Sequence, residues 1–142
     1  MKMRNILVLI LFLNLSHLYS QAQEITKPSI KNGTFYFYPK NSKNRFCIIR
    51  MDSLQKEINL TTNDTSFWRI NWQNDSSVSA RFLRSTNKMP DGEVSFFKTH
   101  VVVMRIKNIS SLYYTFSGGL DSFENLGDKK DTAWLSPKTI AN

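Results

Sequence analysis

Few residues in this chain have the chemistry of a catalytic or metal site, and they are scattered. Beyond residue 22 the chain carries one histidine, His100, and one cysteine, Cys47. A zinc site made of side chains gathers several His, Cys, Asp or Glu ligands, and the common serine-hydrolase elbow, G-x-S-x-G, does not occur in the sequence. The carboxylates Glu57, Glu93 and Asp121 have no acidic, histidine or cysteine partner at a spacing that would indicate a catalytic or metal site. We therefore expect a non-enzyme with no metal and no cofactor, in which His100 and Cys47 are structural.

The charge balance favours an anionic partner. Lys and Arg number 19 against 11 Asp and Glu, which gives a net charge of +8. Such a balance suits a lipopolysaccharide, a membrane surface or an acidic glycan. The simpler interpretation is that dispersed lysines keep the domain soluble. Nucleic acid is not expected as a partner, because the chain is expected to be exported and its aromatic residues are needed for a core.

The first 22 residues have the layout of a secretory signal peptide. "MKMRN" is basic, "ILVLILFLNL" is apolar, and "SHLYSQA" ends in small residues. We expect cleavage after Ala22, so that the mature chain begins at Gln23 and is secreted or periplasmic. The uninterrupted apolar run at 6–13 has 8 residues, against about 20 in a membrane span, so we expect a leader and no anchor. One cysteine leaves no internal disulfide, and the fold must depend on burial alone.

Residues 23–119 alternate between apolar and polar positions, as antiparallel strands do, with turn residues between the runs. We expect an all-β antiparallel meander of about 7–8 strands, built as a sandwich or a partly open barrel. Residues 120–142 are expected to form a C-terminal extension: a short helix in which Leu120, Phe123 and Leu126 share a face, followed by a loose tail. The expected strands lie at 34–38, 45–51, 54–60, 66–72, 78–84, 93–98, 100–106 and 111–117.

The stretch "WRINWQNDSSVSARF" at 68–82 predicts a hairpin with a specific register. A five-residue loop at 73–77 pairs Trp72 with Val78, Ile70 with Ala80 and Trp68 with Phe82, and it places all six on one face. Trp68, Trp72 and Phe82 then belong to the core, or they line a ligand site if a cavity exists there.

The opposite face of that hairpin carries Arg69 directly across from Arg81. Like charges in this position are unfavourable unless an anion or a carboxylate lies between them. Arg69 and Arg81 are therefore the candidate anion-binding residues. The alternative is that an Asp or Glu of a neighbouring strand neutralises them.

Two further hairpins follow from the same pattern. Pairing Met51 with Leu54 places Cys47 inside and leaves Arg50 and Glu57 as an exposed charge pair of about 0–1 kcal/mol. Pairing Ile106 with Ser111 gives a hairpin that is apolar on both faces, which the 120–126 segment is expected to cover.

These residues resemble a group of small, secreted, uncharacterised proteins of flavobacterium-like (Bacteroidota) bacteria. In that group a Gly-x-Phe motif precedes Arg…Gln-x-Glu and then a Trp before an Asp-Cys-x-Tyr loop. Ser76 and Val78 depart from the pattern where it has the cysteine and the tyrosine. The resemblance implies an exported bacterial β-domain and no particular activity. The matching residues are Gly33, Phe35, Arg50, Gln55, Glu57, Trp72 and Asp75.

Two functions remain open. The first is a non-catalytic cell-envelope protein that binds an anionic envelope component or another protein. The second is a lipocalin-like carrier of a small apolar ligand, because a barrel of eight strands can enclose one small molecule. A hollow lumen would favour the carrier, and a solid aromatic core would exclude it.

Overall fold

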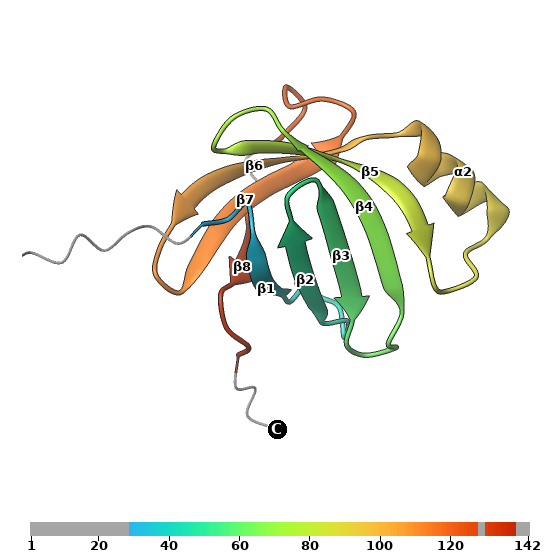
Figure 1. Cartoon of the computed structure of the whole chain (residues 1–142), viewed down its shortest axis with the longest axis horizontal. Helices are drawn as coiled ribbons and strands as arrows, with labels where there is room; N and C mark the ends of the chain where they lie inside the picture. The colour runs from blue at the N-terminus through green and yellow to red at the C-terminus, as the bar shows by residue number, and fades with distance from the viewer. Residues whose placement is uncertain (1–28, 128–129, 139–142) are drawn as a thin grey trace, which may run out of the picture.

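The computed structural model describes residues 29–127 and 130–138. The expected signal peptide at 1–22 and the end of the tail at 139–142 lie outside these residues. The described chain forms eight antiparallel strands in a meander that closes on itself as a barrel (Figure 1). The predicted all-β meander is confirmed, and the barrel is closed. The strands are β1 (Gly33–Phe37), β2 (Phe46–Met51), β3 (Leu54–Asn59), β4 (Thr65–Trp72), β5 (Ser77–Ser85), β6 (Val102–Ile109), β7 (Tyr113–Leu120) and β8 (Asp131–Trp134).

Strand β8 closes the barrel and was missing from the sequence prediction. It pairs with β1 through Tyr36–Trp134 and with β7 through Tyr113–Trp134. The helix expected at 120–126 was wrong: Leu120 ends β7, and Asp121 takes a left-handed φ of 64°. Leu126 nevertheless packs on the sheet, since a Cβ at Gly119 would lie 3.0 Å from its Cδ2. The described part of the tail, which was expected to be loose, contacts the barrel, because the Lys138 amide donates to the Tyr38 hydroxyl at 3.0 Å.

The strand expected at 93–98 was also wrong. This segment belongs to the helix α2 (Asp91–Thr99), which Figure 1 shows beside β5. Pro90 precedes the helix, acidic Asp91 and Glu93 lie in its first turn, and Lys98 lies in its last turn, so these charges complement the helix dipole. Within the described residues, no helix has the length and apolar character that crossing a bilayer requires.

The register predicted for the β4–β5 hairpin is confirmed at all three pairs, Trp72–Val78, Ile70–Ala80 and Trp68–Phe82. A β-bulge follows between Phe67 and Trp68. The β2–β3 register is confirmed too, at Met51–Leu54, Ile49–Lys56 and Cys47–Ile58.

The faces assigned to the β2–β3 hairpin were wrong. Arg50 is only 1% exposed and Gln55 only 4%, and Ile48 belongs to the core. Cys47 is buried as well, but it lies on the opposite face of β2, as alternation requires. The face with more polar residues therefore points into the barrel, so the polar side chains of β2 and β3 lie in its interior.

The register predicted for the β6–β7 hairpin was wrong. Ile106 pairs with Phe116, and a bulge lies between Ile106 and Asn108. The hairpin turns at Ser110, whose amide donates to the Tyr113 carbonyl at 2.8 Å. The bulge and this turn shift the pairing, so that Phe116 faces inward with Ile106.

Two groups of buried apolar residues fill opposite parts of the barrel. One is built around β1, β2, β7 and β8, and the other around β4 and β5 with Phe97 of α2 packed against it. The first group comprises Ile30, Phe35, Ile48, Ile106, Tyr114, Phe116 and Ala133, and the second comprises Trp68, Ile70, Val78 and Phe82.

Candidate functional site

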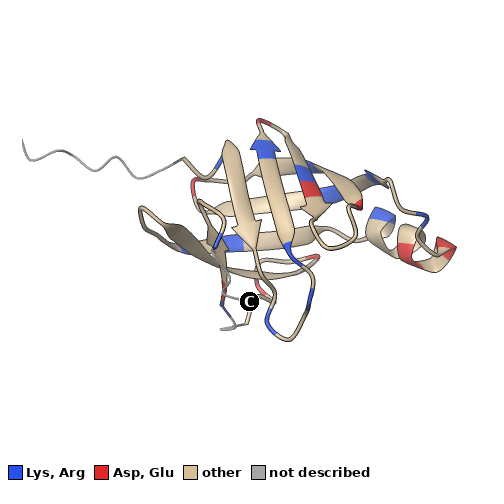
Figure 2. Ribbon diagram, turned by 90° about the horizontal axis from the view of Figure 1, so that it is seen from below, with Lys and Arg blue, Asp and Glu red and all other residues tan. Residues whose placement is uncertain are grey.

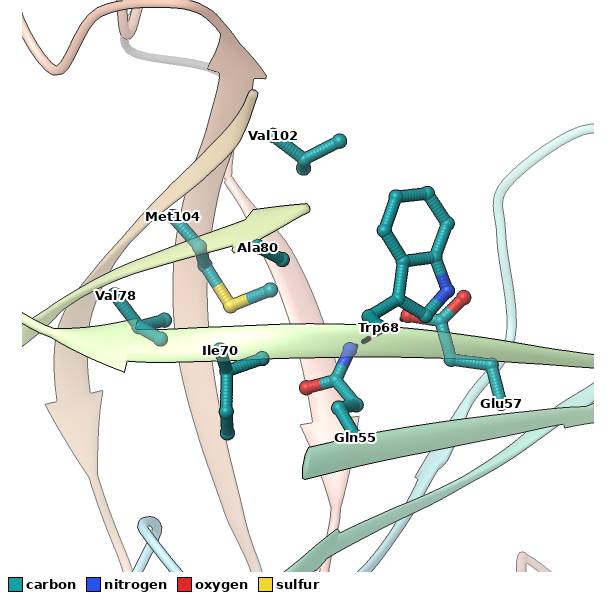
Figure 3. Close-up of a pocket in the computed structure, with 8 residues that line it drawn as sticks. All are labelled: Gln55, Glu57, Trp68, Ile70, Val78, Ala80, Val102 and Met104. Carbon is teal, nitrogen blue, oxygen red and sulfur yellow. Dashed lines mark hydrogen bonds between the residues drawn. The ribbon is translucent and has the colours of Figure 1, made fainter. Parts of the chain in front are cut away.

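A cavity of about 190 Å³ lies inside the barrel between the two apolar groups. Its walls come from the inward faces of β3, β4, β5 and β6 (Figure 3). Six of the eight lining side chains are apolar, and the polar exceptions are neighbours on β3. The lining residues are Gln55, Glu57, Trp68, Ile70, Val78, Ala80, Val102 and Met104.

Two further spaces share residues with this cavity. An inner space of about 170 Å³ lies beside β1, β2 and β7 and shares Glu57 and Met104 with it. A wider cleft of about 510 Å³ lies at one end of the barrel, where the exposed side chains of Asn87 and Glu93 line it together with Glu57. Glu57 lines all three, so it marks the point where the lumen meets its mouth.

Hydrogen bonds hold Glu57 in place. The Gln55 side-chain amide donates to Glu57 Oε1 at 2.6 Å, and Figure 3 shows the indole nitrogen of Trp68 turned toward the same carboxylate. Burial raises the pKa of Glu57 above its ordinary value, while hydrogen bonding from Gln55 and the positive charge of Arg50 act in the opposite direction. In the described residues, the lumen thus contains a half-buried carboxyl group that accepts a hydrogen bond from Gln55.

Arg50 is buried behind Gln55 and does not itself line the lumen. Its Nε donates to Gln55 Oε1 at 2.6 Å, and its Nη1 donates to the Ile30 carbonyl at 3.0 Å. Its guanidinium carbon lies 5.2 Å from the ring centre of Phe35, 5.7 Å from Trp72 and 5.5 Å from Tyr114. These rings face the cation with their negative π surfaces, so Arg50 is stabilised in the interior without direct contact with a carboxylate.

Gln55 connects the two charged groups. Arg50 can only donate, so the carbonyl oxygen of the Gln55 amide must face it and the NH₂ group must face Glu57. The result is a chain from guanidinium through amide to carboxylate. The expected contact between Arg50 and Glu57 therefore exists as a relay through the buried Gln55 amide and not as an exposed ion pair.

Of the residues that carry the sequence resemblance, Phe35, Gln55 and Trp72 contact Arg50 directly. Gly33 has a φ of +136°, and a Cβ there would lie 3.4 Å from the Phe35 ring, so glycine suits both the backbone and the ring. Asp75 pairs with Lys31 at 2.7 Å, and the Lys31 ammonium lies 5.8 Å from the ring centre of Trp72.

The aromatic residues proposed from the sequence have different roles. Trp68 lines the cavity. Phe82 lies behind it, 5.3 Å from Trp68 between ring centres and 6.0 Å from Phe97. Trp72 packs against Arg50, behind the lining of the lumen. The inward face of this hairpin is therefore filled with side chains at Phe82 and hollow in front of Trp68 and Ile70.

Arg69 and Arg81 lie directly opposite each other, as the register predicted, and both are exposed on the outer face of the barrel. Within residues 29–127 and 130–138, the ion pairs are Lys31–Asp75 and the His100–Asp121 contact, and neither involves these arginines. Figure 2 shows that basic residues outnumber acidic ones along the strands.

His100 and Cys47 take part in local packing. His100 caps the end of α2 and stacks on Phe96, with 4.2 Å between ring centres. Burial raises the pKa of the Cys47 thiol. In the described part of the chain, no three His, Cys, Asp or Glu side chains gather closely enough to hold a metal ion.

Sequence reasoning missed Glu57, Gln55 and Arg50 as site residues. The signal was present in the β2–β3 register, which places all three on one face beside Ile48. Comparisons with protein-family models, with curated proteins and with solved structures found no match to this chain. The geometry of the lumen is therefore the basis for inferring the function.

Proposed function

We propose that this protein is a non-catalytic carrier that binds a small, largely apolar molecule inside its barrel. The observation that supports the proposal is the hollow lumen of about 190 Å³, walled by Trp68, Ile70, Val78 and their neighbours. An apolar cavity of about 150 Å³ in another protein accommodates benzene, so this space suits one ring or a short branched chain. The cleft at the open end provides a route for entry.

We also propose that the protein acts outside the cytoplasm. Residues 1–22 have the composition of a signal peptide, and removal after Ala22 would leave Gln23 as the first residue of a secreted or periplasmic bacterial protein. N-terminal sequencing of the exported chain tests this. A chain that retains Met1, or one that stays in the cytoplasm, would contradict it.

Binding in the lumen can be tested with phenethyl alcohol as a compact, neutral probe. We expect titration to shift the indole ¹⁵N–¹H signal of Trp68, because this ring lines the cavity, and to leave the signal of Trp134 unchanged. Ala80→Phe places a ring inside the cavity and is expected to abolish the shift. Asn71→Phe adds the same ring at an exposed position on the opposite face of the sheet and provides the matched control. Equal probe binding by both variants would refute a site in the lumen.

A second candidate function concerns the outer face. Arg69 and Arg81 oppose each other across β4 and β5, and Lys56 on β3 faces outward next to Phe67 in the same strip. Like charges held this close favour an anion between them. We propose that this strip binds an anionic component of the cell envelope.

Co-sedimentation with phosphatidylglycerol vesicles tests the outer strip. We expect Arg69→Gln/Arg81→Gln to lose binding, whereas Lys40→Gln/Lys43→Gln, which removes the same charge from the β1–β2 loop, should retain most of it. Equal losses in both variants would show a dependence on net charge alone, which would contradict a local site.

A further inference from the structure

The charged side chains that line the two inner spaces and the mouth are acidic, whereas Arg50 lies behind this lining and Arg84 and Lys98 line a separate hollow beside the mouth. In the part of the chain that the structure describes, Glu57 is the single ionisable side chain that lines the two inner spaces, and Asp64 and Glu93 line the mouth with it. Among the described residues, no Lys or Arg lines any of the three spaces. This contrasts with a chain whose net charge is +8. A ligand that enters the barrel therefore meets negative charge at the mouth and again inside.

The hydrogen bonds around Glu57 favour its ionised form. Arg50 fixes the orientation of the Gln55 amide, so Glu57 Oε1 accepts a hydrogen bond and does not donate one. Arg50 itself lies behind Gln55 and lines none of the three spaces. The carboxylate is thus the charged group that is within reach of a ligand.

Aromatic rings complete the environment that a cation would meet. Phe97 and Phe46 line the mouth, and Trp68 lines the inner cavity. Such rings attract ammonium groups through their π faces. Glu57 is half-buried, so folding has already removed part of its water and an incoming cation gains an ion pair without the full cost of desolvating the carboxylate.

We propose that the ligand is an organic cation, specifically a primary amine with a compact apolar body. The body occupies the cavity between Ile70, Val78 and Met104, and the ammonium group donates to the Glu57 carboxylate. This inference rests on the proposed carrier function and specifies its ligand class. An anionic ligand would place its charge against Glu57, and a neutral alcohol would form only an ordinary hydrogen bond.

Three probes of similar size separate these ligand classes: phenethylamine, phenethyl alcohol and hydrocinnamate. Their binding is measured at pH 7 through the indole signal of Trp68. A charge-assisted hydrogen bond is roughly twice as strong as a neutral one, so phenethylamine should bind about tenfold more tightly than phenethyl alcohol. Hydrocinnamate should bind more weakly than both.

Glu57→Gln retains the shape of the side chain and the hydrogen bond from Gln55 but removes the charge. We expect this variant to bind the amine and the alcohol within about threefold of each other, with the affinity for the alcohol close to that of the unmodified protein. Glu124→Gln removes the same charge from an exposed position that lines none of the three spaces, and it should keep the tenfold preference.

The outcomes separate this inference from the carrier proposal. Binding of the alcohol with no preference for the amine, or a preference that survives Glu57→Gln, would overturn the amine assignment and leave the carrier function standing. No shift of Trp68 with any of the three probes would overturn both.

Discussion

Arg50 is the residue whose replacement should disturb this fold most. It is 1% exposed, it donates to Gln55, to the Ile30 carbonyl and to the Met104 sulfur at 3.7 Å, and it contacts three aromatic rings. Methionine in its place would fill much of the space and provide no donor. Gln55 Oε1 and the Ile30 carbonyl would then lose their donor, and Glu57 would lose a nearby positive charge.

The size of the effect follows from these losses. Leaving a buried hydrogen-bond acceptor without its donor costs about 1–3 kcal/mol, and Arg50→Met does this to Gln55 Oε1 and to the Ile30 carbonyl. We therefore expect Arg50→Met to lower the free energy of unfolding by about 2–6 kcal/mol at pH 8. For a domain of this size that corresponds to a fall in Tm of about 10–20 °C. Urea denaturation followed by tryptophan fluorescence measures the change, provided that the m value stays constant.

A double-mutant cycle tests whether Arg50 and Glu57 act through the relay. Arg50→Met/Glu57→Gln should be more stable than the sum of the two single changes predicts, by at least about 1 kcal/mol. Arg69→Met changes an exposed arginine to the same residue and should stay within about 0.5 kcal/mol of the unmodified protein. Equal costs for Arg50→Met and Arg69→Met, or strict additivity in the cycle, would refute the relay.

Three other predictions concern Glu57, Cys47 and the outer arginines. Burial raises the pKa of Glu57 above 4.5 in the folded state, so the folded protein holds a proton that the unfolded chain has released. Stability should therefore fall as pH rises from 4.5 through the raised value, and urea titrations should show no such contribution in Glu57→Gln. Cys47 is buried with a raised pKa, so a thiol reagent followed by absorbance should react far more slowly with the folded protein than in denaturant; equal rates would contradict this. Arg81→Glu places opposite charges across β4 and β5 and should raise the unfolding free energy by about 0.2–1 kcal/mol, which denaturation with an Arg81→Gln control can resolve.

The sequence predicts the β4–β5 hairpin down to its individual pairs because two signals agree there. The apolar residues alternate without interruption from Trp68 to Trp72, and a five-residue polar loop leaves one register that keeps both tryptophans on one face. In the β6–β7 hairpin, alternation and loop length do not select the same register. Both of its faces are apolar, so alternation cannot select a register, and the bulge after Ile106 is a local irregularity that no simple pairing includes.

Strand β8 and helix α2 show the limits of local pattern. The four residues Asp131–Trp134 are too few for a recognisable period, and they become a strand because β1 and β7 both offer an unpaired edge. In α2, the apolar residues Val94, Phe96 and Phe97 fit a strand almost as well as a helix. The segment folds as a helix because Pro90 and the acidic first turn favour a helix start. Phe97 then packs in the core beside Trp68.

The candidate site was missed because polar residues were expected to face water. That rule usually holds for Arg, Gln and Glu. Here Arg50 is compensated by aromatic rings and by the Gln55 amide, so the polar face of β2 and β3 can point into the barrel. The closure of the barrel depends on β8, which the sequence pattern did not reveal.

The central claim is that the barrel contains an apolar space open to small molecules. A crystal structure under xenon pressure tests it most directly, since xenon enters empty apolar cavities. We expect xenon between Trp68, Ile70 and Met104, and we expect Ala80→Phe to exclude it. Side chains that fill this space, or xenon bound solely at the outer surface, would contradict the account.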